Sequence, residues 1–162
     1  MLSTRLINMI EDHAEELMSG LIGKLKTHPR TPAYRRFSDS EIHSRAYTVY
    51  KNLGAWMVGK PEDEIRQHYN GLGLKRYEEG TPLHEVIYAL ILTKNNLLDY
   101  VRTSGLAGTA LEIYAEQELS NKVDQFFDTA IYYTVVGYEK PEARDIAMAP
   151  GGQATGATTS RT

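Results

Sequence analysis

Apolar side chains recur at spacings of three and four residues over most of this chain, and that periodicity most constrains the fold. Because an α-helix turns once every 3.6 residues, such spacing places the apolar residues on one helix face. The first such run covers 6–25 and predicts one helix of about six turns, ended by Pro29 and Pro32. Four acidic residues lie on the opposite side of that helix: Glu11, Asp12, Glu15 and Glu16.

Caps and helix breakers define two further helices in the first half of the chain. Ser38 and Glu41 form a capping box, in which each side chain satisfies a backbone N–H of the first turn. The third predicted helix covers 61–79 and contains Gly71 and Gly73. Each glycine costs up to about 1 kcal/mol relative to alanine. We therefore expect a neighbouring helix or a ligand to approach closely there.

The second half of the chain predicts two longer helices. One covers 82–102, and the other starts at a second capping box of Thr109 and Glu112 and reaches about Val136. From Phe126 onward the last helix is apolar around most of its circumference, which is typical of a helix buried on several sides. One of those sides is expected to be a partner subunit. The residues assigned to this homodimer interface are Phe126, Phe127, Ile131, Tyr132 and Val135.

The helical pattern ends near Tyr138, and residues 147–162 are mostly Gly, Ala, Thr and Ser. Such a segment lacks the apolar weight to pack against a core. The predicted fold is therefore all-α, a five- or six-helix bundle with a globin-like arrangement as one option. It forms a single domain over 1–140, followed by a disordered, flexible C-terminal tail over 141–162.

Composition excludes several classes of chemistry and of partner. The chain has no cysteine, which rules out disulfides, zinc knuckles, iron–sulfur sites and a thiol nucleophile. A net charge of −3 argues against binding to nucleic acid. The longest strongly apolar runs, 86–92 and 130–138, are far shorter than the roughly 18 residues of a membrane span. No signal-peptide core fits the N-terminus, so we expect a cytoplasmic protein.

No catalytic or metal-binding constellation stands out. No glutamate is followed three residues later by a histidine, as a carboxylate-bridged di-iron bundle requires, and no His-Glu-x-x-His occurs. Residues 54–61 match a phosphate-loop pattern until Pro61, which replaces the serine or threonine that binds magnesium. The sequence therefore predicts neither an enzyme nor a bound metal.

Candidate ligand-binding residues begin with His68. It shares a helix face with Ile65, Tyr69, Leu72 and Arg76. A histidine in this place is either a core or rim residue with a satisfied partner, or the proximal ligand of a haem iron.

Lys94 falls on the apolar stripe of the helix predicted over 82–102. It either extends its ammonium to the edge of the core or anchors an anionic ligand. Tyrosines can line a pocket because each combines a large apolar body with a hydroxyl. The candidate ligand-binding residues are His68, Tyr69, Lys94, Tyr50 and Tyr88.

Four short segments carry a family resemblance. They are Tyr-Glu-Glu-Gly-Thr-Pro-Leu-His-Glu-Val at 77–86, Ala-Leu-Ile-Leu-Thr-Lys at 89–94, Phe-Phe-Asp at 126–128 and Gly-Tyr-Glu at 137–139. In these segments the chain resembles the N-terminal domain of RsbRD-type proteins, the RsbT co-antagonists of bacterial stressosomes. The likeness extends over about 1–140. It implies an all-helical sensory or interaction domain, related in role to non-haem globin-like input domains.

Domains of that family are typically dimeric and often precede a phosphorylatable STAS domain, which nothing after Tyr138 can form. The chain is thus either a stand-alone input module or a fragment of a longer protein. The leading hypothesis is a non-catalytic sensory or regulatory domain that acts by dimerisation and by binding a ligand or a signalling protein, without a cofactor. The alternative is a globin-like protein that binds haem or a small molecule through His68, with Lys94 as an anion anchor.

Overall fold

The computed structural model describes residues 2–59, 62–103 and 108–140, and over these ranges it is helical without a strand. This confirms the predicted all-α bundle, whereas the globin-like option stays a prediction and the proposed tail lies outside the described residues. No described helix is long and apolar enough to cross a membrane. The elements are α1 (Leu2–Asp12), α2 (Ala14–Thr27), the 3-10 turn η1 (Pro32–Arg36), α3 (Asp39–Lys51), the π-helical turn η2 (Ala55–Gly59), α4 (Glu62–Glu79), α5 (Leu83–Thr103) and α6 (Ala110–Glu139).

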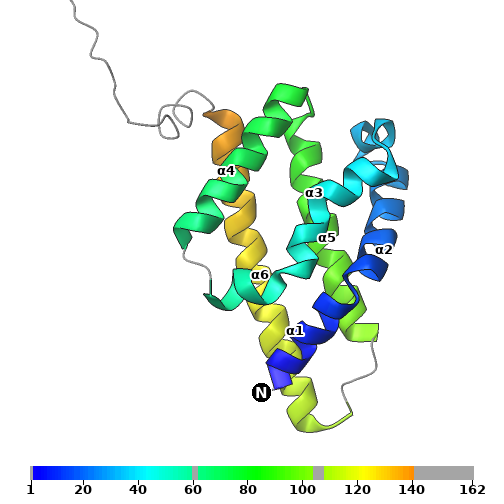
Figure 1. Ribbon diagram of the computed structural model, residues 1–162, viewed down its shortest axis with the longest axis vertical. Coiled ribbons are helices and arrows are strands. Elements are labelled where there is room, and N and C mark those ends of the chain that lie inside the picture. Colours follow the sequence, from blue (N-terminus) through cyan, green and yellow to red (C-terminus); the bar gives the residue numbers. More distant parts are fainter. Residues whose placement is uncertain (1, 60–61, 104–107, 141–162) are drawn as a thin grey trace, which may run out of the picture.

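Helix α6 runs along the length of the molecule and contacts α1, α4 and α5 (Figure 1). Its second half is therefore covered by other helices of the same chain. Phe126 is 6% exposed and Phe127 is fully buried, so the prediction that these two residues face a partner subunit is wrong. Ile131 packs partly buried against the core, and Tyr132 is exposed. Val135, the fifth residue of the predicted interface, is half-buried.

The helix predicted over 6–25 is divided at His13. The His13 backbone leaves the helical region with ψ of 23°, and its ring nitrogen lies 2.7 Å from the Met9 carbonyl oxygen. The apolar face nevertheless continues across the break, because Ile10 and Ala14 are both buried. Apolar periodicity therefore gives no sign of the break.

The capping box predicted at Ser38 is present, since the Ser38 hydroxyl accepts the Glu41 N–H and the Glu41 carboxylate accepts the Ser38 N–H. The α-helix ends at Lys51, and the apolar residues from Ala55 onward lie in the π-helical turn η2. Between α3 and η2, the Glu11 carboxylate accepts the backbone N–H of Gly54 at 2.9 Å and connects α1 to this segment.

Helices α4 and α6 cross with their backbones in contact. A Cβ added at Gly73 would overlap the Thr134 carbonyl oxygen and lie 2.7 Å from the Tyr138 nitrogen. A Cβ added at Gly137 would overlap the Asn70 carbonyl oxygen and lie 2.7 Å from the Asn70 Cα. The close approach predicted for this part of α4 is thus confirmed at Gly73 and comes from a helix of the same chain.

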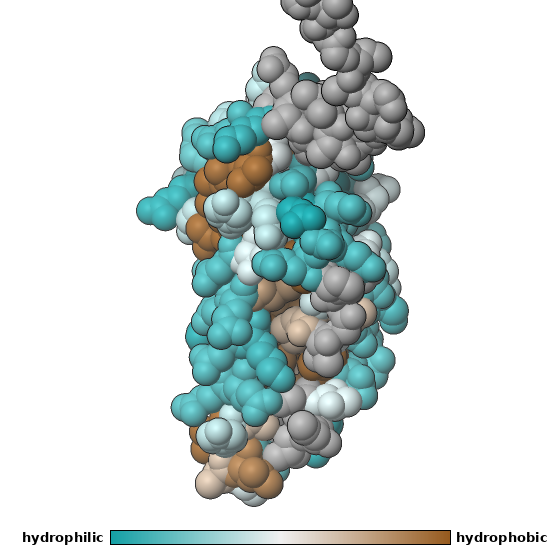
Figure 2. All heavy atoms as spheres, turned by 90° about the vertical axis from the view of Figure 1, so that its left-hand side faces the viewer, coloured by the Kyte–Doolittle hydropathy of each residue, from teal (hydrophilic) through white to brown (hydrophobic). Residues whose placement is uncertain are grey.

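The surface turned to the viewer in Figure 2 is largely hydrophilic, with apolar patches at a few places. One patch lies at the lower end of the molecule, where α6 begins. The exposed large apolar side chains near the start of α6 are Leu111, Ile113 and Tyr114.

Candidate ligand-binding site

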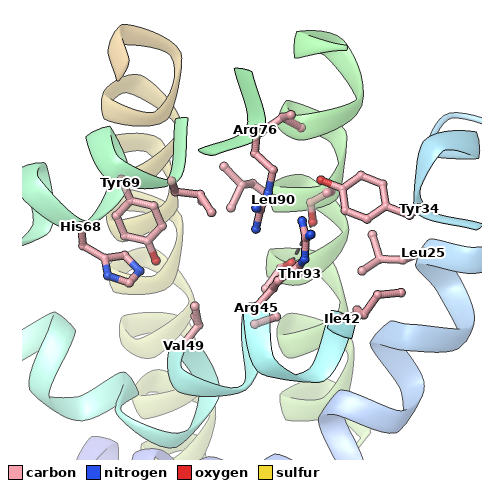
Figure 3. A pocket seen from close by; sticks show the side chains of 14 residues that line it. Leu25, Tyr34, Ile42, Arg45, Val49, His68, Tyr69, Arg76, Leu90 and Thr93 are labelled. Atoms are coloured by element: carbon pink, nitrogen blue, oxygen red, sulfur yellow. Dashed lines mark hydrogen bonds between the residues drawn. The ribbon is translucent and has the colours of Figure 1, made fainter. Parts of the chain in front are cut away.

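A mostly apolar cavity of about 60 Å³ lies among α3, α4, α5 and the ends of α2 and η1 (Figure 3). Its volume is several times the ~10–15 Å³ that a single water-sized sphere needs. Most of the wall is built from aliphatic side chains of α2, α3, α4 and α5: Leu25, Ile42, Val49, Leu72, Val86 and Leu90.

A wider groove of about 560 Å³ adjoins this cavity on the side of α3 and α4. The groove falls within the range of roughly 300–1,000 Å³ that is usual for small-molecule sites. The cavity is the inner end of the groove, since five residues line both spaces: Arg45, Val49, His68, Leu72 and Arg76.

Tyr69, predicted as a binding residue, lines the cavity and is 1% exposed. Its hydroxyl is buried and has no hydrogen-bond partner within the described part of the chain. In Figure 3 the hydroxyl end of the ring points toward Val49. Burial raises the pKa of Tyr69, so the hydroxyl is neutral and can both donate and accept. An unsatisfied buried hydroxyl costs about 1–3 kcal/mol, which a ligand atom at this point would recover.

His68, the second predicted residue at this site, lies at the rim and is exposed. Its ring centroid is 4.9 Å from that of Trp56 and 4.8 Å from that of Tyr69. The cavity beside it is far smaller than the ~300 Å³ of the smallest usual ligand pockets, so a haem macrocycle does not fit within the cavity itself, and haem binding through His68 stays a prediction. Within residues 2–59, 62–103 and 108–140, no group of three His, Asp or Glu side chains is placed to hold a metal ion.

Three arginines surround one carboxylate at the mouth of the cavity. Arg45 donates to both carboxylate oxygens of Glu79, at 2.9 and 2.8 Å. Arg76 donates to the same oxygens at only 3.4 and 3.5 Å, and Arg36 donates to the Glu79 backbone carbonyl at 3.4 Å. Partial burial raises the pKa of Glu79, but the Arg45 hydrogen bonds and the three guanidinium charges outweigh burial and hold it below the usual value.

The end of α4 determines where two of these charges lie. Gly80 adopts a left-handed φ of 76°, and its N–H bonds to the Tyr77 carbonyl. The Thr81 N–H bonds to the Arg76 carbonyl at 3.1 Å, which completes a Schellman motif. Arg76 and Glu79 thus share the last turn of α4. The helix end predicted at Gly80 is confirmed.

Arg76 is the most buried of the three cations, with its side chain 7% exposed. It is also hydrogen-bonded to the Tyr34 hydroxyl, which points toward it in Figure 3. Burial, and after it the charge of Arg45, lowers the pKa of the Arg76 guanidinium. Arg45 in turn lies 4.0 Å above the Phe37 ring, which restricts where its guanidinium can point.

The other three predicted ligand-binding residues lie elsewhere. Lys94 pairs with Asp124 at 3.4 Å and links α5 to α6, so it is no anchor for an anion in the cavity. Tyr50 is fully buried, and its hydroxyl donates to the Thr93 carbonyl at 2.8 Å. Tyr88 packs its ring 4.8 Å from that of His28.

Sequence reasoning missed the roles of Arg45 and Glu79. A partial signal existed for Arg76, because the helical spacing places it on one face with Tyr69 and Leu72. An arginine on an apolar face is either paired or aimed at a ligand. Arg45 carries no such signal, because its role depends on how α3 meets α4.

No family model, curated protein or solved structure matches this chain. The resemblance to RsbRD-type input domains rests on the sequence segments alone and stays a prediction. What the site shows by itself is an apolar cavity, an adjoining groove and an excess of cationic side chains where the two meet.

Proposed function

We propose that this chain is a non-catalytic, cytoplasmic sensory domain that binds a small molecule in the cavity and groove between α3 and α4. It acts without a cofactor, as RsbRD-type input domains are expected to do. The observation that carries the proposal is Tyr69, which lines the apolar cavity and whose buried hydroxyl has no hydrogen-bond partner among the described residues. Buried polar groups are nearly always hydrogen-bonded, so we take this hydroxyl, on a residue in the cavity wall, as a group that a bound ligand would satisfy.

The location of the cavity suits a sensor because segments from distant parts of the chain form its walls. The Arg45–Glu79 ion pair links α3 to the end of α4 across the groove. A ligand shifts a conformational equilibrium only through differential contacts in the two states. A molecule that enters between α3 and α4 gains those contacts, and α4 transmits the change to α6 through the contact at Gly73.

Homodimerisation and a signalling-protein partner belong to the same proposal. We place the proposed dimer surface on the exposed apolar residues at the start of α6, because Phe126 and Phe127 in its second half are buried. Leu111 is 67% exposed and Tyr114 is 66% exposed, with Ile113 between them in the sequence. Association of two chains through this patch would cover apolar area that one chain leaves in water.

Trp56, the only tryptophan in the chain, provides the test, because its ring lies beside His68 and Tyr69. N-phenyl-1-naphthylamine is a neutral apolar probe that fluoresces when it leaves water. We expect saturable one-to-one binding with energy transfer from Trp56. Hydrogen exchange should then slow in α4 when the probe is bound.

Ala46→Leu tests whether the probe binds in the cavity, because Ala46 lines the cavity and the larger leucine side chain would fill it. Ala110→Leu makes the same chemical change at an exposed position at the start of α6. We expect Ala46→Leu to weaken probe binding by about tenfold, or about 1.4 kcal/mol, and Ala110→Leu to leave it unchanged. Equal binding by wild type and Ala46→Leu would refute this site, as would the absence of saturable binding.

A further inference from the structure

The lining of the cavity and groove is cationic although the chain as a whole is acidic. Arg45, Lys75 and Arg76 line these spaces, and Glu79 is the one carboxylate among the residues that line them. With His68 neutral, these side chains leave a net charge of +2, in a chain whose net charge is −3. Opposite charge concentrated at the mouth of an apolar cavity favours an anionic ligand.

Glu79 satisfies the two guanidinium groups unequally. Its carboxylate is bidentate on Arg45 at 2.8–2.9 Å and reaches Arg76 only at 3.4–3.5 Å. The more deeply buried cation therefore has the weaker partner. A guanidinium carries five N–H donors, and carboxylates are its strongest bidentate acceptors. Arg76 can thus donate hydrogen bonds to a second carboxylate on the side that faces the cavity.

We propose that the ligand is a small amphipathic carboxylate, whose charged group binds Arg76 and Arg45 in competition with Glu79 and whose short apolar tail fills the cavity. This inference rests on the proposed function, because it names the chemistry of the molecule that the same site binds. Glu79 lines the groove but not the cavity, whereas Arg45 and Arg76 line both. A carboxylate that enters the cavity therefore meets the two guanidinium groups from the side that Glu79 leaves open.

Two further groups favour a carboxylate at this position. The Tyr34 hydroxyl lines the cavity and is hydrogen-bonded to Arg76, so it can donate a third hydrogen bond to the bound anion. The aliphatic wall, which includes Val49 and Leu90, excludes water from a short hydrocarbon chain. A fully polar anion such as inorganic phosphate makes no apolar contact with that wall.

Binding changes how α3 is joined to α4. Glu79 is the last residue of α4, and its ion pair with Arg45 connects that helix end to α3. A ligand carboxylate that takes Arg45 leaves this connection weakened and frees the last turn of α4. The ligand thereby replaces a contact within the protein, which gives the two states different contacts at a defined place.

The test uses the full chain and two probes with the same six-carbon tail, hexanoate and hexan-1-ol, each competing with N-phenyl-1-naphthylamine. We expect hexanoate to displace that probe at a concentration about tenfold lower than hexan-1-ol, because only hexanoate carries the charge. Glu79→Gln should strengthen hexanoate binding by about three- to tenfold and leave hexan-1-ol unchanged. Glu78→Gln, at the exposed neighbouring position, is the matched control and should alter neither.

Arg45→Gln should remove most of the preference for hexanoate over hexan-1-ol. The Arg45 side chain is 21% exposed, so we expect this variant to fold. Arg76→Lys keeps the positive charge but loses the planar guanidinium that can donate two parallel hydrogen bonds to a carboxylate. It should therefore weaken the binding of hexanoate and leave that of hexan-1-ol unchanged. If the probe binds but hexanoate and hexan-1-ol compete equally, or if Arg45→Gln retains the preference, the carboxylate inference fails and the proposed function stands. If the neutral probe does not bind at all, both fail.

Discussion

Substitution of Gly137 by alanine should destabilise the fold, although glycine-to-alanine changes inside a helix usually stabilise it. The new Cβ would overlap the Asn70 carbonyl oxygen and lie 2.7 Å from the Asn70 Cα and 2.8 Å from its carbonyl carbon. These are backbone atoms of α4 and cannot rotate away as a side chain can. To restore ordinary contact, α4 must move away from α6 by about 1 Å along much of the crossing.

The magnitude follows from two opposing effects. Overpacking that shifts the backbone typically costs about 1–3 kcal/mol and occasionally more, and a clash with backbone belongs at the upper end. Replacing glycine by alanine inside a helix returns about 0.5–1 kcal/mol. We expect Gly137→Ala to lower the free energy of unfolding by at least about 2 kcal/mol. For a chain of this size, that lowers Tm by about 4–8 °C. Gly73→Ala should lower the free energy of unfolding by a similar amount, because its Cβ would overlap backbone atoms of α6.

Gly71→Ala is the matched control, because it lies two residues from Gly73 on α4 and a Cβ there meets nothing within 4 Å. Gly23→Ala in α2 is a second control with equally open space. Both should raise stability by about 0.5–1 kcal/mol. Urea denaturation followed by circular dichroism measures all four variants. A Gly137→Ala protein as stable as wild type, or a Gly71→Ala protein equally damaged, would refute backbone contact between α4 and α6.

Three further predictions concern α6 and the arginine cluster. Ile113→Glu should convert a dimer to a monomer in sedimentation velocity with Tm unchanged; a wild type that is monomeric at high micromolar concentration contradicts the dimer. Phe127→Ala should instead lower the free energy of unfolding by about 3–5 kcal/mol, because Phe127 is fully buried; a loss below about 1 kcal/mol in urea denaturation contradicts that burial. The Glu79 carboxylate should stabilise the fold above its unfolded pKa of about 4.5, and this stabilisation is lost as pH falls through the lower folded pKa. Glu79→Gln should therefore flatten the acid side of the stability profile; a profile that changes equally in Glu78→Gln contradicts the assignment.

Features that depend on neighbouring residues were predictable from the sequence. The capping box at Ser38, the cap at Thr109 and the helix end at Gly80 each use residues within a few positions of one another. At the second cap the pattern differs in one detail, since the Glu112 carboxylate accepts the Gly108 N–H. Local hydrogen bonding fixes helix ends, so their signals survive in the sequence.

Features set by the meeting of distant segments were not predictable. The break at His13 leaves the apolar face continuous, so no periodicity marks it. The apolar second half of α6 correctly indicated burial on several sides, but spacing cannot tell a partner subunit from helices of the same chain. His68 and Tyr69 were placed at the site from one helix face, whereas the partnership of Arg45 with Glu79 joins residues that are 34 positions apart.

The glycine contact between α4 and α6 also fixes how far one helix can slide along the other. Helices that meet through ordinary side chains can repack after a shift of one turn, because flexible groups exchange places. At this crossing, a slide of one turn would bring Asn70 or Thr134 to a point where only a hydrogen atom fits. Helix α4 can therefore pack on α6 at only one position along the helix axis. A displacement at the groove end of α4 must appear as a tilt or rotation of α6, over the full 30 residues of that helix.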